Sequence, residues 1–338
     1  MLRRYMIPLT CLRAHAGGRP FAPLILAGLI LLFPSLANAQ ELGETGLRDF
    51  PPDTQQVAYL NMAELRSSPN YFAIHRQLFD RRMDEFEMFL RQVGTDGEKD
   101  VDEILLGWRG GKIERENFFG VASGRFDPQH AHDLAADQGV MVVNYHGAEL
   151  FGFNGGETNS DLYFTCFDGT TAAFGRQTDL KAMVDLHSSD GPALDSNADF
   201  VSWENELDSA APQWGIARGP AAAVQAAPWF EGAGKIPIDP ATVMAPIKAV
   251  LYRVDWTSGF TAHLSLICQK AENATALAQL IALWKASQQA PPAKGQSGLA
   301  PLFQSLQAQA DGTRVELSAS GPVEIVGQII RGAGSGEE

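Results

Sequence analysis

The chain has 338 residues, of which 45% are hydrophobic and 20% are charged, a composition typical of a globular protein. This length suggests two domains and allows each of them a sizeable core. The formal charge is −14 and no run of basic residues interrupts the acidic composition, which argues against nucleic acids and anionic lipid surfaces as partners.

The first 39 residues are predicted to be a cleavable signal peptide. They contain four arginines and no acidic residue, and the ten-residue apolar run from Leu24 to Phe33 precedes the small-x-small pattern Ala37-Asn38-Ala39. Because ten residues are too few to span a bilayer, we predict cleavage after Ala39 and no integral membrane segment afterwards. The mature chain would be a soluble periplasmic or extracellular protein with 22 basic and 40 acidic residues, a net charge of −18.

Residues 40–232 are predicted to form a first α+β domain. A strand at 57–60 is followed by a helical region with one apolar stripe, made by Phe86, Phe89, Leu90 and Val93. Extended segments with turn residues between them then predict a strand-rich meander at 140–145, 150–153, 162–167 and 171–174. Asp168-Gly169 is its clearest hairpin signal. Helices are predicted at 180–187 and from Ser196 onward, and a strand at 213–217.

Residues 233–331 are predicted to form a second, smaller α+β domain, and 332–338 a disordered tail. The segment PWFEGAGKIPIDPATV at 228–243 is rich in proline and glycine, which favours a domain boundary there. Residues 260–268 alternate between apolar and polar side chains, as in a half-buried strand. The helix expected next has a stripe of Leu277, Leu280, Ile281 and Trp284.

A strand followed by a helix occurs twice, at 118–139 and at 260–285. In the first unit, Asp127-Pro128 supplies an N-cap and a proline at the first helical position. An old duplication and a chance recurrence of a common unit both remain open, because residue identity between the two units is low. The expected fold class is α+β, with two domains that each have an antiparallel or mixed sheet and helices packed on one face.

Two glycine-rich segments resemble phosphate-binding loops but do not fit the pattern. The segment at 107–112, GWRGGK, has spacing one residue short, and Ile113 replaces the hydroxyl residue that would bind magnesium. The segment at 232–235, GAGK, fails in the same way. The sequence also lacks G-x-S-x-G, H-E-x-x-H and C-x-x-C motifs.

Two acidic or histidine-containing clusters could be taken for metal sites. His130 and His132 lie beside Asp127 and Asp133, but residues i and i+2 of a helix point about 200° apart and cannot share an ion. The alternating acidic residues at 96–102 lack the glycine and the distal glutamate of an EF-hand loop. We therefore predict no metal ligand, no cofactor and no assignable catalytic residue.

The remaining candidate side chains have structural interpretations that are at least as simple. His187 lies on an apolar helical stripe, and His263 faces the polar side of its strand. Trp203, Trp214 and Trp229 could line an apolar or sugar-binding groove, although such tryptophans more often close a domain interface.

Only Cys166 and Cys268 remain after cleavage of the signal peptide. Export would permit a disulfide between them. Their positions on two predicted core strands in different predicted domains favour buried free thiols, which behave as small hydrophobic groups.

One resemblance extends over much of residues 51–190. The segments PPDTQQVAYLNMAELRSSP and VGTDGEKDVDEILLGW, followed by a Phe-x-Gly strand and an Asp-capped helix, resemble a group of exported bacterial proteins of unknown function. The resemblance implies a protein of the cell envelope. Its motifs are structural, so it assigns no catalytic residue.

The sequence therefore favours an exported, soluble binding protein or interaction scaffold over an enzyme. A hydrolase whose residues converge only in the folded chain is one alternative, because many active sites have no local motif. A carrier that holds an apolar small molecule between the domains is another, suggested by the tryptophans. The expected partner is thus a protein or a small apolar ligand, and the oligomeric state is left open.

Overall fold

The computed structural model describes residues 41–72, 75, 81–110, 118–155, 160–189, 191–207, 211–219, 221–222, 244–257, 259–288 and 300–325, all within the unit Ala39–Glu338. The signal peptide at 1–39, the boundary at 232–233 and the tail at 332–338 lie outside the described residues and stay predictions. No helix in the described ranges is long and apolar enough to cross a membrane.

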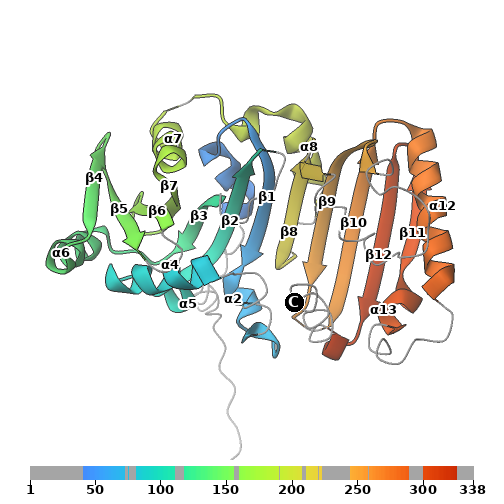
Figure 1. Ribbon diagram of the computed structural model, residues 1–338, viewed down its shortest axis with the longest axis horizontal. Helices are drawn as coiled ribbons and strands as arrows, with labels where there is room; N and C mark the ends of the chain where they lie inside the picture. Colours follow the sequence, from blue (N-terminus) through green and yellow to red (C-terminus); the bar gives the residue numbers. More distant parts are fainter. Residues whose placement is uncertain are drawn as a thin grey trace, which may run out of the picture. The chain divides into compact units, whose positions relative to one another are not determined.

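The described strands form one twelve-stranded sheet in which all neighbours are antiparallel (Figure 1). Their order is β11-β12-β10-β9-β8-β1-β2-β3-β7-β6-β5-β4. The strands are β1 Thr54–Asn61, β2 Val101–Arg109, β3 Phe118–Gly124, β4 Met141–Tyr145, β5 Ala148–Gly155, β6 Ser160–Cys166, β7 Thr171–Arg176, β8 Gln213–Arg218, β9 Ile247–Asp255, β10 Phe260–Cys268, β11 Gln307–Asp311 and β12 Arg314–Gly321.

The α+β class and the antiparallel pairing are confirmed, but the expectation of a separate sheet in each domain is not. β8 pairs with β1 on one side and with β9 on the other. The backbone groups of β8 are therefore satisfied on both sides, and the ladder continues from the strands before residue 232 to those after it.

The helices are α1 Glu41–Thr45, α2 Met62–Leu65, α4 Arg81–Gln92, α5 Gly97–Asp100, α6 Pro128–Gln138, α7 Gln177–His187, α8 Ala198–Glu206, α12 Ala271–Gln288 and α13 Ala300–Ser305, with 3-10 helices η1 Gly46–Asp49 and η2 Leu194–Ser196. The predicted start of α6 is confirmed, because the Asp127 side chain accepts a hydrogen bond from the amide of His130. The predicted start of α8 is off by one residue: Asn197, not Ser196, caps the amide of Phe200.

The two halves of the sheet have related strand orders. In the first half, three neighbouring strands (β1, β2, β3) lead into α6, and the return strands end with β7 beside β3. In the second half, β8, β9 and β10 lead into α12, and the return strands end with β12 beside β10. This arrangement is what a duplication would produce, with β1 and β8 as the antiparallel pair at the centre.

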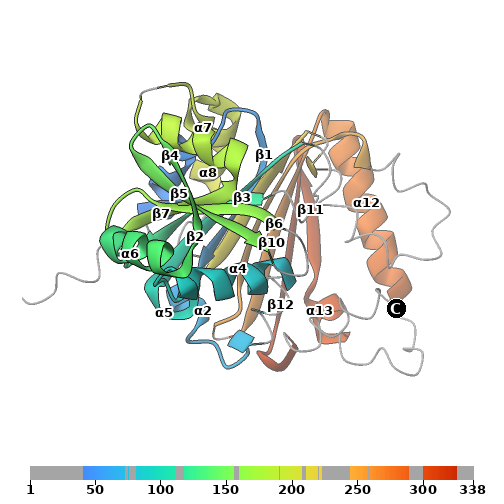
Figure 2. The ribbon, with the colours of Figure 1, turned by 60° about the vertical axis from the view of Figure 1, so that its left-hand side comes forward.

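Side chains of each strand alternate between two faces of the sheet. We call the face with Ala58 and Leu60 the first face and the face with Val57 and Tyr59 the second face. On the first face, buried residues of α4 and α6 pack on the strands of the first half, and α12 packs on those of the second half. On the second face, α7 and α8 supply buried residues, so that helices lie on both sides of β1 to β7 (Figure 2). The expectation that helices cover one face therefore fails in this half.

The centre of the sheet is held by a stacked pair of aromatic rings and a buried carboxylate. Tyr59 of β1 lies opposite Trp214 of β8, with ring centroids 5.2 Å apart and planes 17° apart. The Tyr59 hydroxyl donates a hydrogen bond of 2.5 Å to Oε1 of Glu103, a residue that is only 1% exposed. Oε2 of Glu103 accepts hydrogen bonds from the Leu42 amide at 3.3 Å and the Ser123 hydroxyl at 3.0 Å. Burial and the bond to Glu103 raise the pKa of Tyr59.

We expect Tyr59→Phe to lower the free energy of unfolding by about 1–3 kcal/mol, because it removes one donor from a buried carboxylate. Tyr71→Phe is the matched control, since the buried Tyr71 hydroxyl has no partner in the part of the chain that the structure describes. The control should be neutral or slightly stabilising. Urea denaturation followed by tryptophan fluorescence measures both, and equal effects of the two substitutions would contradict this account of Glu103.

Both cysteines of the described chain are free thiols, as the sequence favoured. Cys166 lies on β6 and Cys268 on β10, and six strands separate these two in the sheet order. Burial, followed by the carboxylates of Asp127 and Asp168, raises the pKa of the Cys166 thiol to about 12.

We expect mass spectrometry of the unreduced, unfolded protein to find alkylation of Cys166 and Cys268. In the folded protein at pH 8, Cys166 should react about a thousandfold more slowly than an unperturbed thiol, because the reactive thiolate is depleted to that extent. A disulfide-linked peptide pair in the unreduced sample, or fast native labelling of Cys166, would contradict this.

Candidate functional site

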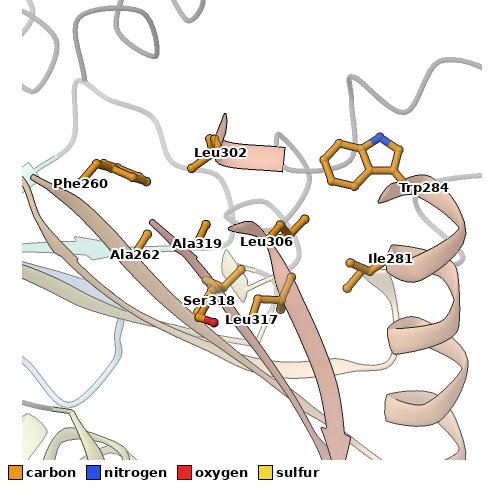
Figure 3. A pocket seen from close by; sticks show the side chains of 10 residues that line it. Phe260, Ala262, Ile281, Trp284, Leu302, Leu306, Leu317, Ser318 and Ala319 are labelled. Carbon is orange, nitrogen blue, oxygen red and sulfur yellow. The ribbon is translucent and has the colours of Figure 1, made fainter. Parts of the chain in front are cut away.

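An almost entirely apolar cavity lies between the second half of the sheet and the helices on its first face. Its volume is about 110 Å³. Strands β10 and β12 form the floor, and α12, α13 and the residue after α13 form the walls (Figure 3). The lining residues are Phe260, Ala262, Leu264, Ile281, Trp284, Leu302, Leu306, Leu317, Ser318 and Ala319.

The cavity exists because two small residues face each other across neighbouring strands. Ala262 of β10 pairs with Ala319 of β12 in the register of the sheet. Phe260 and Leu264, two positions away on β10, and Leu317 on β12 have larger side chains that rise on either side. The two alanines therefore leave a hollow that the surrounding side chains enclose.

Helices α12 and α13 complete the enclosure. Ile281 and Trp284 are one turn apart on α12 and face the strands, and Leu302 of α13 lies opposite the two alanines (Figure 3). The apolar stripe that the sequence predicted on this helix therefore has two roles. Leu277 and Ile281 are buried in the core against β10 and β12, whereas Trp284 extends the stripe over the cavity.

The chemistry of the lining is suited to an apolar group. None of the ten lining residues carries a charge, and the indole N–H of Trp284 is the polar side-chain group on the cavity side. Ser318 alternates with Leu317 and Ala319 along β12, so its hydroxyl is on the second face. Apolar cavities of about 150 Å³ bind benzene-sized molecules, whereas sites for drug-sized ligands are about 300–1,000 Å³. The cavity can therefore accept an aromatic ring or a short segment of hydrocarbon chain.

The histidines considered in the sequence do not converge. His132 faces the carboxylate of Glu149, with Nδ1 2.9 Å from both oxygens, while His130 lies over Gly94 at the end of α4. His187 stacks on Phe167 at 3.9 Å and places Nδ1 3.1 Å from the buried carboxylate of Asp49. In the described ranges, no group of three or more histidine, cysteine, aspartate or glutamate side chains could hold a metal ion.

His263 lies on the second face, in a polar recess of about 180 Å³ beside α8. Ser265, the next residue on the same face of β10, donates a hydrogen bond of 2.5 Å from its hydroxyl to Glu316 of β12. Arg314 forms an ion pair with Glu206 at the end of α8. The polar side chains of this recess therefore bind one another: the Ser265 hydroxyl binds Glu316, and Arg314 pairs with Glu206.

The acidic segment at 96–102 is engaged in structural contacts. Asp96 caps α5 through the Glu98 amide and pairs with Lys99 at 2.6 Å. Asp100 lies 3.5 Å from Arg125, and Asp102 lies 3.2 Å from Arg66. Each of these three carboxylates has a basic neighbour, so this segment is a helical turn leading into β2 and not a calcium loop.

The described part of the first glycine-rich segment has a structural role. Gly107 to Arg109 belong to β2, and Arg109 pairs with Asp53 at 3.0 Å and Asp179 at 2.9 Å. The segment at 232–235 is not among the described residues.

The tryptophans considered in the sequence do not line the cavity. Trp203 and Trp214 are buried in the core of the second face, with residues from both sides of the predicted boundary, and Trp229 lies outside the described residues. The cavity instead uses Trp284 and residues within 260–319, inside the predicted second domain. The cavity was not predicted from the sequence, because two alanines leave a hollow only when the register of β10 and β12 places them opposite each other.

No protein-family model matches the chain, and no curated protein sequence matches it. Among solved structures, crystal form I of TP0453 matches it with a TM-score of 0.50 and 10% sequence identity. The match covers 85% of this chain and 96% of the TP0453 chain. At this identity the match concerns the fold alone: the chain is similar in fold to TP0453 over nearly the whole length of that protein.

Proposed function

We propose that the chain is a non-catalytic binding protein of the bacterial cell envelope that holds a small apolar ligand in the cavity beneath α12 and α13. The observation that carries the proposal is the cavity itself, whose lining on the first face is apolar except for the indole N–H of Trp284. Removing an aromatic or aliphatic group from water into such a site is favourable by about 25 cal/mol per Å² of apolar surface buried. The envelope location rests on the predicted signal peptide.

A binding role also fits the distribution of titratable groups better than a hydrolase does. Among the described residues, four histidine–carboxylate pairs lie at separate places: His75 with Glu87, His132 with Glu149, His146 with Asp185, and His187 with Asp49. The Cys166 thiol has a pKa raised to about 12 and is a poor nucleophile. A hydrolase would require a nucleophile, a base and an oxyanion site within one cleft.

The test is a calorimetric titration of the purified protein with benzene as the probe, a neutral aromatic molecule of about the size that the cavity admits. We expect the heat of binding to saturate at one probe per chain. Ala262→Leu or Ala319→Leu should weaken probe binding at least tenfold, because the added carbons of leucine occupy the hollow between the strands. Both variants should melt at or above the temperature of the unchanged protein, because they fill a cavity.

Ala276→Leu is the matched control. It makes the same substitution on an exposed position of α12 and should leave probe binding unchanged. Saturable binding that all three variants retain would place the probe elsewhere and contradict the proposal, as would a lack of saturable binding by the unchanged protein. If the titration supports the proposal, native mass spectrometry of the protein purified from its source envelope would give the mass of the natural ligand. We expect an added mass of a few hundred daltons.

A further inference from the structure

The end of the sheet farthest from the apolar cavity is an edge strand, β4, paired on one side. β4 is the last strand in the sheet order, and β5 is its one partner among the described strands. The loop between β4 and β5 is the two-residue turn His146-Gly147, with φ angles of 47° and 88°. Such a turn makes Tyr145 and Ala148 a hydrogen-bonded pair, and bonded pairs then alternate along the ladder, so Val143 also bonds to β5.

It follows that Val142 and Asn144 direct their N–H and C=O groups away from β5. These four groups face the open edge of the sheet, and an added strand could pair with all of them. An extended peptide bound in this way gains main-chain hydrogen bonds for affinity, and its alternate side chains determine specificity.

A groove next to this edge provides a place for those side chains. It has a volume of about 450 Å³ and lies between the first turns of α6 and the β4–β5 hairpin. Phe151 and Cys166 lie at its base, and Glu149, His132 and Asn144 line it. Asn144 pairs with Glu149, so both side chains are on the same face of the sheet as the groove. Every second residue of an added strand would face the groove.

The charge of this region identifies the kind of peptide. Residues 126–175 contain no lysine or arginine and seven acidic residues: Asp127, Asp133, Asp137, Glu149, Glu157, Asp161 and Asp168. Lys181 of α7 lies near β4, with Nζ 5.2 Å from the centroid of the Tyr145 ring, but on the second face, away from the groove. The flanking Arg125 and Arg176 are each 3.5 Å from a carboxylate, of Asp100 and Asp161 respectively. The raised pKa of Cys166, to which Asp127 and Asp168 contribute, agrees with a negative potential at the base of the groove.

We propose that the β4 edge binds an extended basic segment of another protein as an additional strand, with a lysine or arginine side chain in the groove beside Glu149. Pairing of β4 with β4 of a second copy is disfavoured, because it would bring two segments with seven acidic and no basic residues together. This site uses different residues from the apolar cavity, so either proposal can fail without the other.

The probe is an acetylated, amidated six-residue peptide in which lysine alternates with valine, and the control peptide has glutamate in place of lysine. By NMR with the full mature chain, the lysine peptide should slow hydrogen exchange of the Val142 and Asn144 amides. It should bind at least tenfold more tightly than the glutamate peptide at low salt, and its affinity should fall as salt rises. Glu149→Gln should weaken the lysine peptide specifically.

Asn144→Pro removes one outward N–H without touching the bonds to β5, and should weaken the lysine peptide at least tenfold. Asn144→Ser keeps the N–H and should bind as the unchanged protein does. If the proline variant does not fold, the peptide can be N-methylated on its lysines or, separately, on its valines. One of these two peptides should lose binding, because one alternate set of its amides faces β4.

Equal binding of the lysine and glutamate peptides would overturn the proposal, as would unchanged exchange at Val142 and Asn144. Retention of binding by both N-methylated peptides would also overturn it. Concentration-dependent dimers that protect the same two amides without any peptide would show that a second copy of the chain occupies the edge instead.

Discussion

The pairing of β1 with β8 is the constraint on which the rest of the sheet depends. It joins two groups of strands that otherwise pair only among themselves, and it aligns both faces so that Ala58 of β1 lies beside Gly215 of β8. Tyr59 and Trp214 stack on the other face, and Glu103 fixes the Tyr59 hydroxyl from the neighbouring strand. Since Glu103 also accepts the Leu42 amide, the start of the described chain is attached to the same centre. A carboxylate buried this deeply requires its donors, so the pairing, the stack and α1 support one another.

The two halves have a related strand order but differ in how their faces are used. In the first half, aromatic and aliphatic residues fill both faces beneath helices. In the second half, the second face carries polar groups such as His263 and Ser265, and the first face contains the hollow above Ala262 and Ala319. If the two halves share an origin, the first face of the second half has become less tightly packed than that of the first half, and the cavity is the space that results. The β4 edge, at the opposite end of the sheet, presents unpaired backbone groups and negative charge and has no such apolar cavity beside it among the described residues.

Local patterns in the sequence predicted the elements well and their partners poorly. The alternation at 260–268 and the stripe through Leu277 and Ile281 correspond to β10 and α12, and Asp127-Pro128 does begin α6. Nothing local to β1 states that its second neighbour is a strand more than 150 residues away, so one sheet was divided into two. The cavity was missed for a related reason. An alanine on a strand is unremarkable until a second alanine is placed opposite it, and that placement depends on the register between β10 and β12.

The central pairing also sets the order in which the chain can fold. Strands β1, β2 and β3 can form a meander as soon as they are available, but one edge of β1 has no partner until residues 213–218 have arrived. During that interval Tyr59 lacks the ring that covers it, and a row of backbone groups in an apolar strand is available to other chains. Contacts this distant in sequence form slowly, because a long loop must close before they stabilise anything. A chain interrupted between β7 and β8 would retain most of its elements but keep this edge open, and we expect such fragments to be the species that aggregates or requires a chaperone.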